Sequence, residues 1–257
     1  CWKKKDFNFV IKCLKQEQIS GLDFAPLNYF STWKNILSNS QKLSIVFRKE
    51  GIKINALQGV FFRKNLNLFR NKDKKKIIDH IKIIIKLCKI FRAKKIILGS
   101  VNFRDPKNMK LDKADHNFII FFKHLNKFLR KNNIYLCIEA IPMKYGENYI
   151  YNINHLNYLI SKINSSNIKI NFDTSIYHFR KFKKVEFINN IRNIKNIQIS
   201  QPNFKYFENP TKKNLEFLKI LKQQKKIKNI SLEIIDNRLN EFKFIKSLKN
   251  FKTNIIN

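Results

Sequence analysis

The stretch IYLCIEA, residues 134–140, is an apolar run of strand length that carries a carboxylate, Glu139, near its end. The residues that follow, IPMKYGENY at 141–149, form a largely polar segment with a glycine, which predicts a loop. A buried carboxylate is costly unless a partner compensates its charge. The position of Glu139 therefore predicts a functional site at the end of a buried strand.

Six further apolar runs of strand length alternate with amphipathic segments of helical length. The runs occupy residues 21–26, 52–62, 94–100, 168–173, 196–200 and 229–235. The amphipathic segments occupy residues 74–92, 114–131, 153–164, 183–193, 212–225 and 240–250. If Cys1–Trp2 is the end of a truncated first strand, the chain contains eight strand–helix units.

Eight such units predict an α/β fold, a TIM (β/α)8 barrel, as a single domain over residues 1–257. A doubly wound open sheet alternates in the same way. The chain has no GxGxxG or P-loop glycine pattern at a first strand–helix turn, which disfavours that alternative. A length of 257 residues with 44% hydrophobic content suits one barrel.

The formal net charge of +35 is spread along the whole chain, together with many Asn, Ile and Phe residues. Two interpretations stay open: the codon usage of an AT-rich genome, or a surface that binds a polyanion. The four cysteines, Cys1, Cys13, Cys88 and Cys137, have no CxxC spacing and predict reduced thiols in a cytoplasmic protein. No apolar segment is long enough to suggest a membrane span.

Polar side chains recur near the ends of four successive predicted strands. Side-chain alternation directs Glu139, Asp173, Gln198 and Glu233 into the barrel at its C-terminal end. Three converging carboxylates repel one another, and a divalent cation such as Mn²⁺ or Mg²⁺ is the simplest way to keep them ionised. The alternative is that one of them pairs with a basic residue.

These residues and their surroundings resemble the xylose-isomerase-like TIM barrels, the sugar phosphate isomerase/epimerase family. GSVNFRD (99–105) is similar to the family's GSP-x-x-R pattern, and CIEAIPMKYGENY (137–149) to its IEP-x-P-x-x-YG-x-N pattern. The resemblance implies four metal ligands at Glu139, Asp173, position 198 and Glu233. The family usually has histidine at 198, in an H-I-S-E-P-like stretch, where this sequence has Gln198 and Gln201.

The resemblance implies an isomerase or epimerase that removes a proton next to a carbonyl and returns it through an enediolate. Glu139 and Glu233 are the expected base and acid, and a metal would stabilise the negative charge. We expect a small sugar or sugar phosphate as the partner, no membrane, and leave a homo-oligomer open.

Six further residues are candidates for substrate binding: Arg104, Lys144, Tyr145, Asn148, Gln58 and His178. Arg104 would hold a phosphate or carboxylate with its bidentate fork, unless it is a surface residue paired with Asp105. The other five are alternatively ordinary loop residues.

Two other functions compete with the isomerase prediction. A catalytically drifted barrel that binds a sugar-like ligand or a partner protein would explain Gln198 and Gln201. A nuclease similar to endonuclease IV would use the positive charge on a phosphate backbone. Such nucleases hold several metals with histidines at strand ends, whereas the histidines at 80, 116, 124 and 155 fall in helical patterns, which disfavours a nucleic-acid partner.

Overall fold

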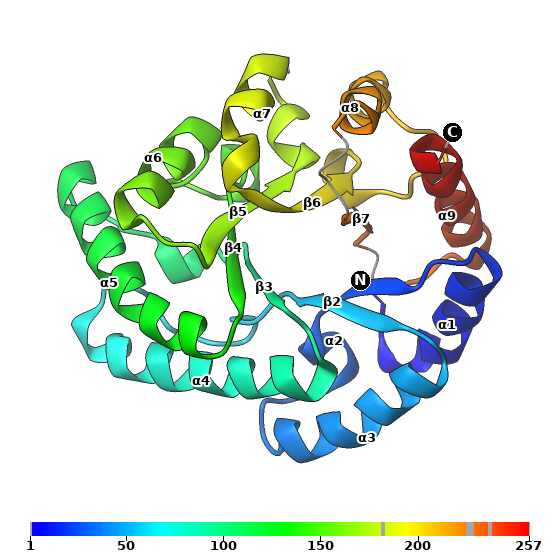
Figure 1. Ribbon diagram of the computed structural model, residues 1–257, viewed down its shortest axis with the longest axis horizontal. Coiled ribbons are helices and arrows are strands. Elements are labelled where there is room, and N and C mark those ends of the chain that lie inside the picture. Colours follow the sequence, from blue (N-terminus) through cyan, green and yellow to red (C-terminus); the bar gives the residue numbers. More distant parts are fainter. Residues whose placement is uncertain (1, 181–182, 225–228, 236–237, 257) are drawn as a thin grey trace.

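The computed structural model describes residues 2–180, 183–224, 229–235 and 238–256 (Figure 1). Within these ranges, seven parallel strands form one sheet in the order of the sequence. They are β1 (Gly21–Phe24), β2 (Lys53–Leu57), β3 (Lys95–Leu98), β4 (Tyr135–Glu139), β5 (Ile168–Asp173), β6 (Ile194–Ser200) and β7 (Ile230–Glu233). The sheet curls into a nearly closed barrel, and Ser231 on β7 donates a 2.6 Å hydrogen bond to Asp23 on β1.

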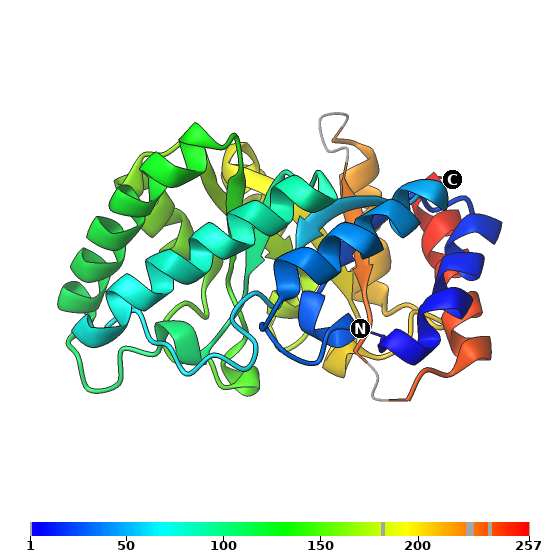
Figure 2. The ribbon, with the colours of Figure 1, turned by 90° about the horizontal axis from the view of Figure 1, so that it is seen from below.

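Helices surround the barrel (Figures 1 and 2). They are α1 (Phe7–Gln16), α2 (Pro26–Tyr29), α3 (Ile36–Lys49), α4 (Lys74–Phe91), α5 (Leu111–Lys131), α6 (Ile153–Ile163), α7 (Lys184–Asn190), α8 (Lys212–Lys222) and α9 (Glu241–Ile256). The first and last lie side by side in both views, and the rings of Phe9 and Phe244 are 6.2 Å apart. Short 3-10 helices follow several strands, among them η3 (Asn102–Arg104), η4 (Met143–Tyr145) and η5 (Thr174–Tyr177).

All seven predicted strands and all six predicted helical segments are confirmed, and the fold is that of a TIM barrel. The second strand is shorter than the predicted run of 52–62, because the chain turns at Gly59, whose φ of +61° suits glycine. Helices α1 and α3 were not among the predicted segments. Trp2 lies outside any strand, and Cys1 lies outside the described residues.

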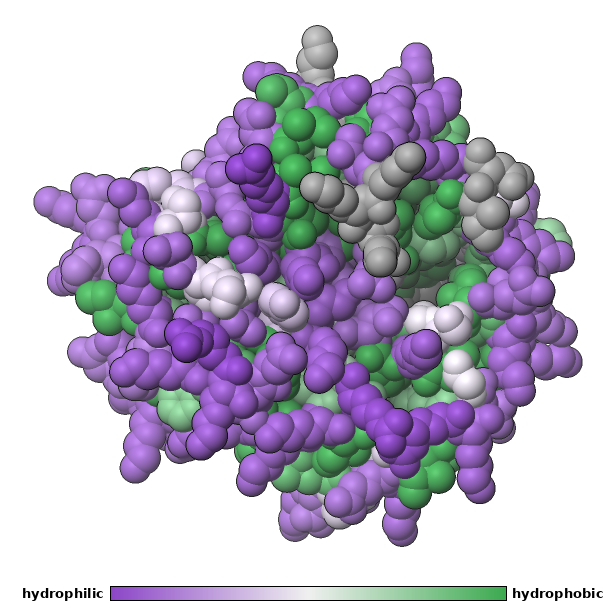
Figure 3. All heavy atoms as spheres, viewed as in Figure 1, coloured by the Kyte–Doolittle hydropathy of each residue, from purple (hydrophilic) through white to green (hydrophobic). Residues whose placement is uncertain are grey.

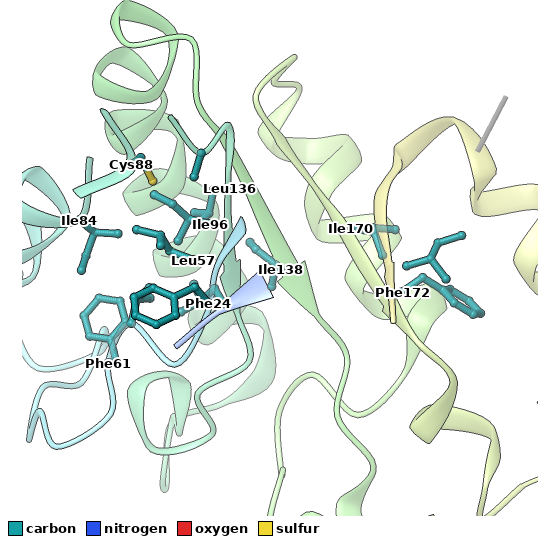
Figure 4. Close-up of a cluster of buried hydrophobic side chains, with 14 of the residues drawn as sticks. Phe24, Leu57, Phe61, Ile84, Cys88, Ile96, Leu136, Ile138, Ile170 and Phe172 are labelled. Atoms are coloured by element: carbon teal, nitrogen blue, oxygen red, sulfur yellow. The ribbon is translucent and has the colours of Figure 1, made fainter. Parts of the chain in front are cut away.

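The main hydrophobic layer lies between the barrel and the helices. Figure 4 shows Ile96 and Leu136 of the strands beside Ile84 and Cys88 of α4. The three cysteines that the structure describes, at 13, 88 and 137, are buried free thiols, as predicted. Hydrophilic side chains cover most of the face seen in Figure 3, which accords with Lys and Arg residues spread along the sequence.

The interior of the barrel is more polar than this outer layer. Lys95, Asn171 and Asn196 are buried on strands that face one another inside it, where branched apolar residues dominate in most TIM barrels. Among the described helices, none has both the length and the apolar character needed to cross a membrane.

Helix α5 offers a test of the outer layer. Phe118 is fully buried, with its ring 4.4 Å from that of Phe122. Phe118→Ala should lower the free energy of unfolding by about 3–5 kcal/mol, since it removes a buried ring and leaves a cavity. Phe242 on α9 is 74% exposed, so Phe242→Ala is the matched control and should change stability by less than about 0.5 kcal/mol. Urea denaturation measures both, and equal losses would contradict the packing described.

Candidate active site at the barrel mouth

Four strands bring the predicted residues to one end of the barrel. Glu139 ends β4, Asp173 ends β5, Gln198 lies in β6 and Glu233 ends β7. Asp173 lies opposite Gln198 in the register, and Ser200 lies opposite Glu233. Glu139, Asp173 and Gln198 are buried, while Glu233 is partly exposed. Glu139 and Glu233 line one cavity at this end of the barrel, which accords with their predicted inward direction.

Glu139 and Gln198 are joined by an amide that the sequence did not indicate as functional. Asn171 Nδ2 donates to Glu139 Oε2 at 3.1 Å and to Gln198 Oε1 at 2.6 Å. Gln198 Nε2 donates in turn to Gln58 Oε1 at 2.9 Å. Gly99 leaves room for the same carboxylate, because a Cβ at this position would lie 2.8 Å from Glu139 Oε2.

One carboxylate oxygen of Asp173 accepts hydrogen bonds from a serine hydroxyl and a backbone N–H. Its Oδ1 accepts hydrogen bonds from the Ser175 backbone N–H and from Ser200 Oγ, each at 2.6 Å. Its Oδ2 is buried, and the side chain of Glu233 lies within hydrogen-bond reach of Asp173, an interaction that helps to raise the pKa of Glu233. A buried carboxylate oxygen of this kind is costly unless a cation or a donor reaches it.

The negative charge of the three carboxylates is not fully balanced by the positively charged groups near them. Burial, followed by the charge of Asp173, raises the pKa of Glu139 to about 8, although Arg104 opposes the shift. Burial also raises the pKa of Glu233 well above its ordinary value, and the charges of Asp173 and Glu139 raise it further. Without a cation, the cluster therefore tends to hold a proton at neutral pH.

The donor types, three carboxylates and one amide oxygen, fit a hard divalent cation. As the side chains are placed, no group of three His, Cys, Asp or Glu residues in the described ranges is spaced to hold a metal ion. Gln198 Oε1 already accepts a hydrogen bond from Asn171, but a carbonyl oxygen has a second lone pair. The residues thus fit the cation by chemistry, although the described side chains are not arranged as a ligand set.

Arg104 lies in a different setting from either alternative that the sequence suggested. It is fully buried, and its Nε and Nη2 contact Glu147 Oε2 at 2.8 and 2.7 Å. The alternative of an exposed pair with Asp105 is therefore wrong. Glu147 was missed, because it lies in a loop where nothing in the sequence distinguishes a buried carboxylate from an exposed one. The pair lies near enough to Glu139 to act on its charge.

The remaining candidates are distributed between the mouth and its rim. Gln58 and Tyr145 line the central cavity. Lys144 is exposed, with its Nζ 4.6 Å from the ring centre of Phe179, and Asn148 is exposed and donates to Asp105. These two side chains contact neighbouring loops and not the cavity lining.

His178 follows η5 and is partly buried near Asp173. Burial lowers its pKa, while the charge of Asp173 opposes that shift. A hydrogen bond with the backbone of Ser200 also opposes it. The other four histidines lie on helices α4, α5 and α6, as predicted; they are His80, His116, His124 and His155.

A cavity of about 480 Å³ opens above these groups. Glu139 and Glu233 line it from opposite strands, and its walls include apolar side chains such as Phe62, Ile141 and Phe204. A second cavity of about 420 Å³ continues beside Gln198 toward β1 and β7. Concave sites with mostly apolar walls and a few convergent polar groups are typical of small-molecule binding.

Comparison with known structures accords with this architecture. A 3-keto-D-glucoside 4-epimerase from E. coli has a TM-score of 0.75 and 11% identity, and the match covers 95% of this chain and 92% of the epimerase. The IolI protein, solved with a bound zinc atom, has a TM-score of 0.75 and 13% identity over 96% and 92%. A family 2 AP endonuclease from Brucella melitensis has a TM-score of 0.74 and 11% identity over 91% and 89%.

At these identities the likenesses establish the fold and not the reaction. No curated protein matches the sequence. The family model described as "Xylose isomerase-like TIM barrel" matches residues 20–251, nearly the whole chain. The chain therefore belongs to the xylose isomerase-like TIM barrel family.

Proposed function

We propose that this protein is a divalent-metal-dependent isomerase or epimerase of a sugar or sugar phosphate. The observation that carries the proposal is the gathering of three acidic side chains at one end of the barrel: Glu139 and Glu233 line one cavity, and the charge of Asp173 acts on both of them. The fold relatives support it, since they include an epimerase of a keto-sugar and a protein with bound zinc.

Glu139, Asp173 and Glu233 would hold the cation, with Gln198 Oε1 as a neutral fourth donor. When bound, the cation would supply Lewis-acid stabilisation of negative charge on the substrate oxygens. The carboxylates would then be ionised, because the positive charge removes their mutual repulsion.

Glu139 and Glu233 would carry the proton transfers. They lie on β4 and β7 and line the same cavity, so that a substrate between them presents one face to each. One carboxylate removes a proton from the carbon next to the carbonyl, and the electron pair moves to form an enediolate. A proton is then returned at the neighbouring carbon or on the other face, and no oxidant or reductant is consumed.

The lining of the cavity favours an uncharged sugar over a phosphorylated one. Arg104 is engaged with Glu147, and the described residues of the lining include no arginine. Lys3 is the cationic side chain that the described lining contains. A phosphate would therefore lack the bidentate partner that it commonly finds in proteins.

Gln201, which together with Gln198 favours the competing proposal of a catalytically drifted barrel, has a structural role here. Its Oε1 accepts from Asn214 Nδ2 at 3.1 Å, and its Nε2 donates to the Asn209 carbonyl at 2.7 Å. Gln201 thus holds the loop before α8.

Metal titration tests the proposal directly. Metal-stripped protein should bind Mn²⁺ with one-to-one stoichiometry in the micromolar range by calorimetry. The double variant Glu139→Gln, Glu233→Gln should lose this binding, because it removes two of the three charged ligands. Glu216→Gln, at an exposed position on α8, is the control and should bind as the unmutated protein does. No binding by the unmutated protein would contradict the proposal and favour the drifted barrel.

The raised pKa of Glu139 predicts a pH dependence of stability in the presence of a chelator. Between its ordinary value of 4.5 and about 8, the folded protein retains a proton that the unfolded chain releases. Stability should therefore fall as pH rises through this window, by up to about 1.4 kcal/mol per pH unit. Urea unfolding across this range measures the slope. Glu139→Gln should reduce the slope, leaving the contribution of Glu233, and Glu216→Gln should not change it. An unchanged slope in Glu139→Gln would refute the assignment.

A further inference from the structure

A line of hydrogen bonds runs inside the barrel from β3 to the mouth. Lys95, the first residue of β3, is 5% exposed, and its Nζ donates a short hydrogen bond to Asn196 Oδ1. Asn196 Nδ2 donates to Asn171 Oδ1 at 2.8 Å. Asn171 Nδ2 then donates to Glu139 Oε2 and Gln198 Oε1. The line thus begins at an ammonium group and ends at a carboxylate.

Lys95 determines the direction of every bond that follows. An ammonium group can only donate, so Asn196 must turn its oxygen toward Lys95. Its amide nitrogen then faces Asn171, which must present its own oxygen in return. Asn171 is left with its nitrogen directed at Glu139 and Gln198, two acceptor oxygens.

The surroundings reinforce this direction. The side chain of Asp23 of β1 lies close to Asn196, and although burial lowers the pKa of Lys95, the charge of Asp23 opposes that shift and favours the ammonium form. Asn196 thus has an ammonium group at its oxygen and acceptors at its nitrogen. Reversal of its amide would place a donor against a donor and an acceptor against an acceptor, which is unfavourable inside a protein.

We propose that Lys95 is a positioning residue for the mouth, which acts through Asn196 and Asn171 on Glu139 and Gln198. The effect of Lys95 on metal binding and catalysis rests on the proposed function. The hydrogen bonds from Lys95 to Glu139 do not depend on that proposal. The line holds Glu139 by Oε2, so that Oε1 stays available to a ligand, and it holds the Gln198 oxygen at the site. If the Asn171 amide turned over, its oxygen would oppose both acceptors.

The test compares Lys95→Met with Lys169→Met. Lys169 lies on β5, is partly buried, and donates to Asn193 at 3.4 Å, so its loss removes a lysine–asparagine contact outside the line. The first readout is hydrogen exchange of the Asn171 side-chain amide by NMR, with its signals assigned by their absence in Asn171→Leu. Lys95→Met should speed this exchange by about tenfold or more, and Lys169→Met should leave it unchanged.

The second readout is Mn²⁺ affinity, which should weaken about tenfold in Lys95→Met and stay unchanged in Lys169→Met. If Lys95→Met does not fold, the double variant Lys95→Met, Asn196→Leu is used instead. It removes both partners of the first hydrogen bond together, so neither is left unpaired by loss of the other. Asn171 should show the same faster exchange in it. Unchanged Asn171 exchange, or equal effects in the Lys95 and Lys169 variants, would overturn the proposal. Absence of Mn²⁺ binding in the unmutated protein would refute the proposed function, while the exchange readout alone would still decide the role of Lys95.

Discussion

The mutual repulsion of three carboxylates in a confined space is the constraint on which the mouth of this barrel depends. Glu139, Asp173 and Glu233 come from three different strands, and parallel pairing brings all three strand ends to the same edge. In the absence of a cation, burial and then the charge of Asp173 raise the pKa of Glu139, and burial and then the charges of Asp173 and Glu139 raise that of Glu233. The surrounding groups reduce the cost of burying these charges. Ser200 and a backbone N–H donate hydrogen bonds to Asp173, and Asn171 donates one to Glu139.

The polar interior follows from the same constraint. A barrel filled with branched apolar side chains would leave Glu139 and Gln198 against a surface that donates no hydrogen bond. Here Asn171 and Asn196 occupy the layer below the mouth, and Lys95 lies beneath them. Amide side chains are suited to this layer, because each accepts at one end and donates at the other. The hydrophobic stabilisation is instead provided by the layer between strands and helices.

The features predicted from the sequence are those that local patterns determine. Side-chain alternation within IYLCIEA and the other strands was sufficient to direct Glu139 and Glu233 inward, and apolar spacing was sufficient for α5. The partners of these residues depend on which atoms meet across strands far apart in the sequence. Lys95 and Asn196 are 101 residues apart, and no local pattern relates them. Arg104 illustrates the same limit, since its motif position suggested a ligand contact and its partner proved to be Glu147.

The glutamine at position 198 changes the type of donor atom in the proposed site and leaves the charge of the site unchanged. Where the resemblance places histidine, a neutral ring would offer one nitrogen lone pair to a metal and one N–H to a neighbour. Gln198 offers an oxygen and an N–H₂ group in the same place, and its N–H₂ is already used by Gln58. Both side chains are neutral, so the balance between three carboxylates and a divalent cation is the same. The set of donors becomes entirely oxygen, which favours Mg²⁺ or Mn²⁺ over a cation that prefers nitrogen ligands. The substitution is therefore compatible with a metal-dependent reaction and alters which metal would support it.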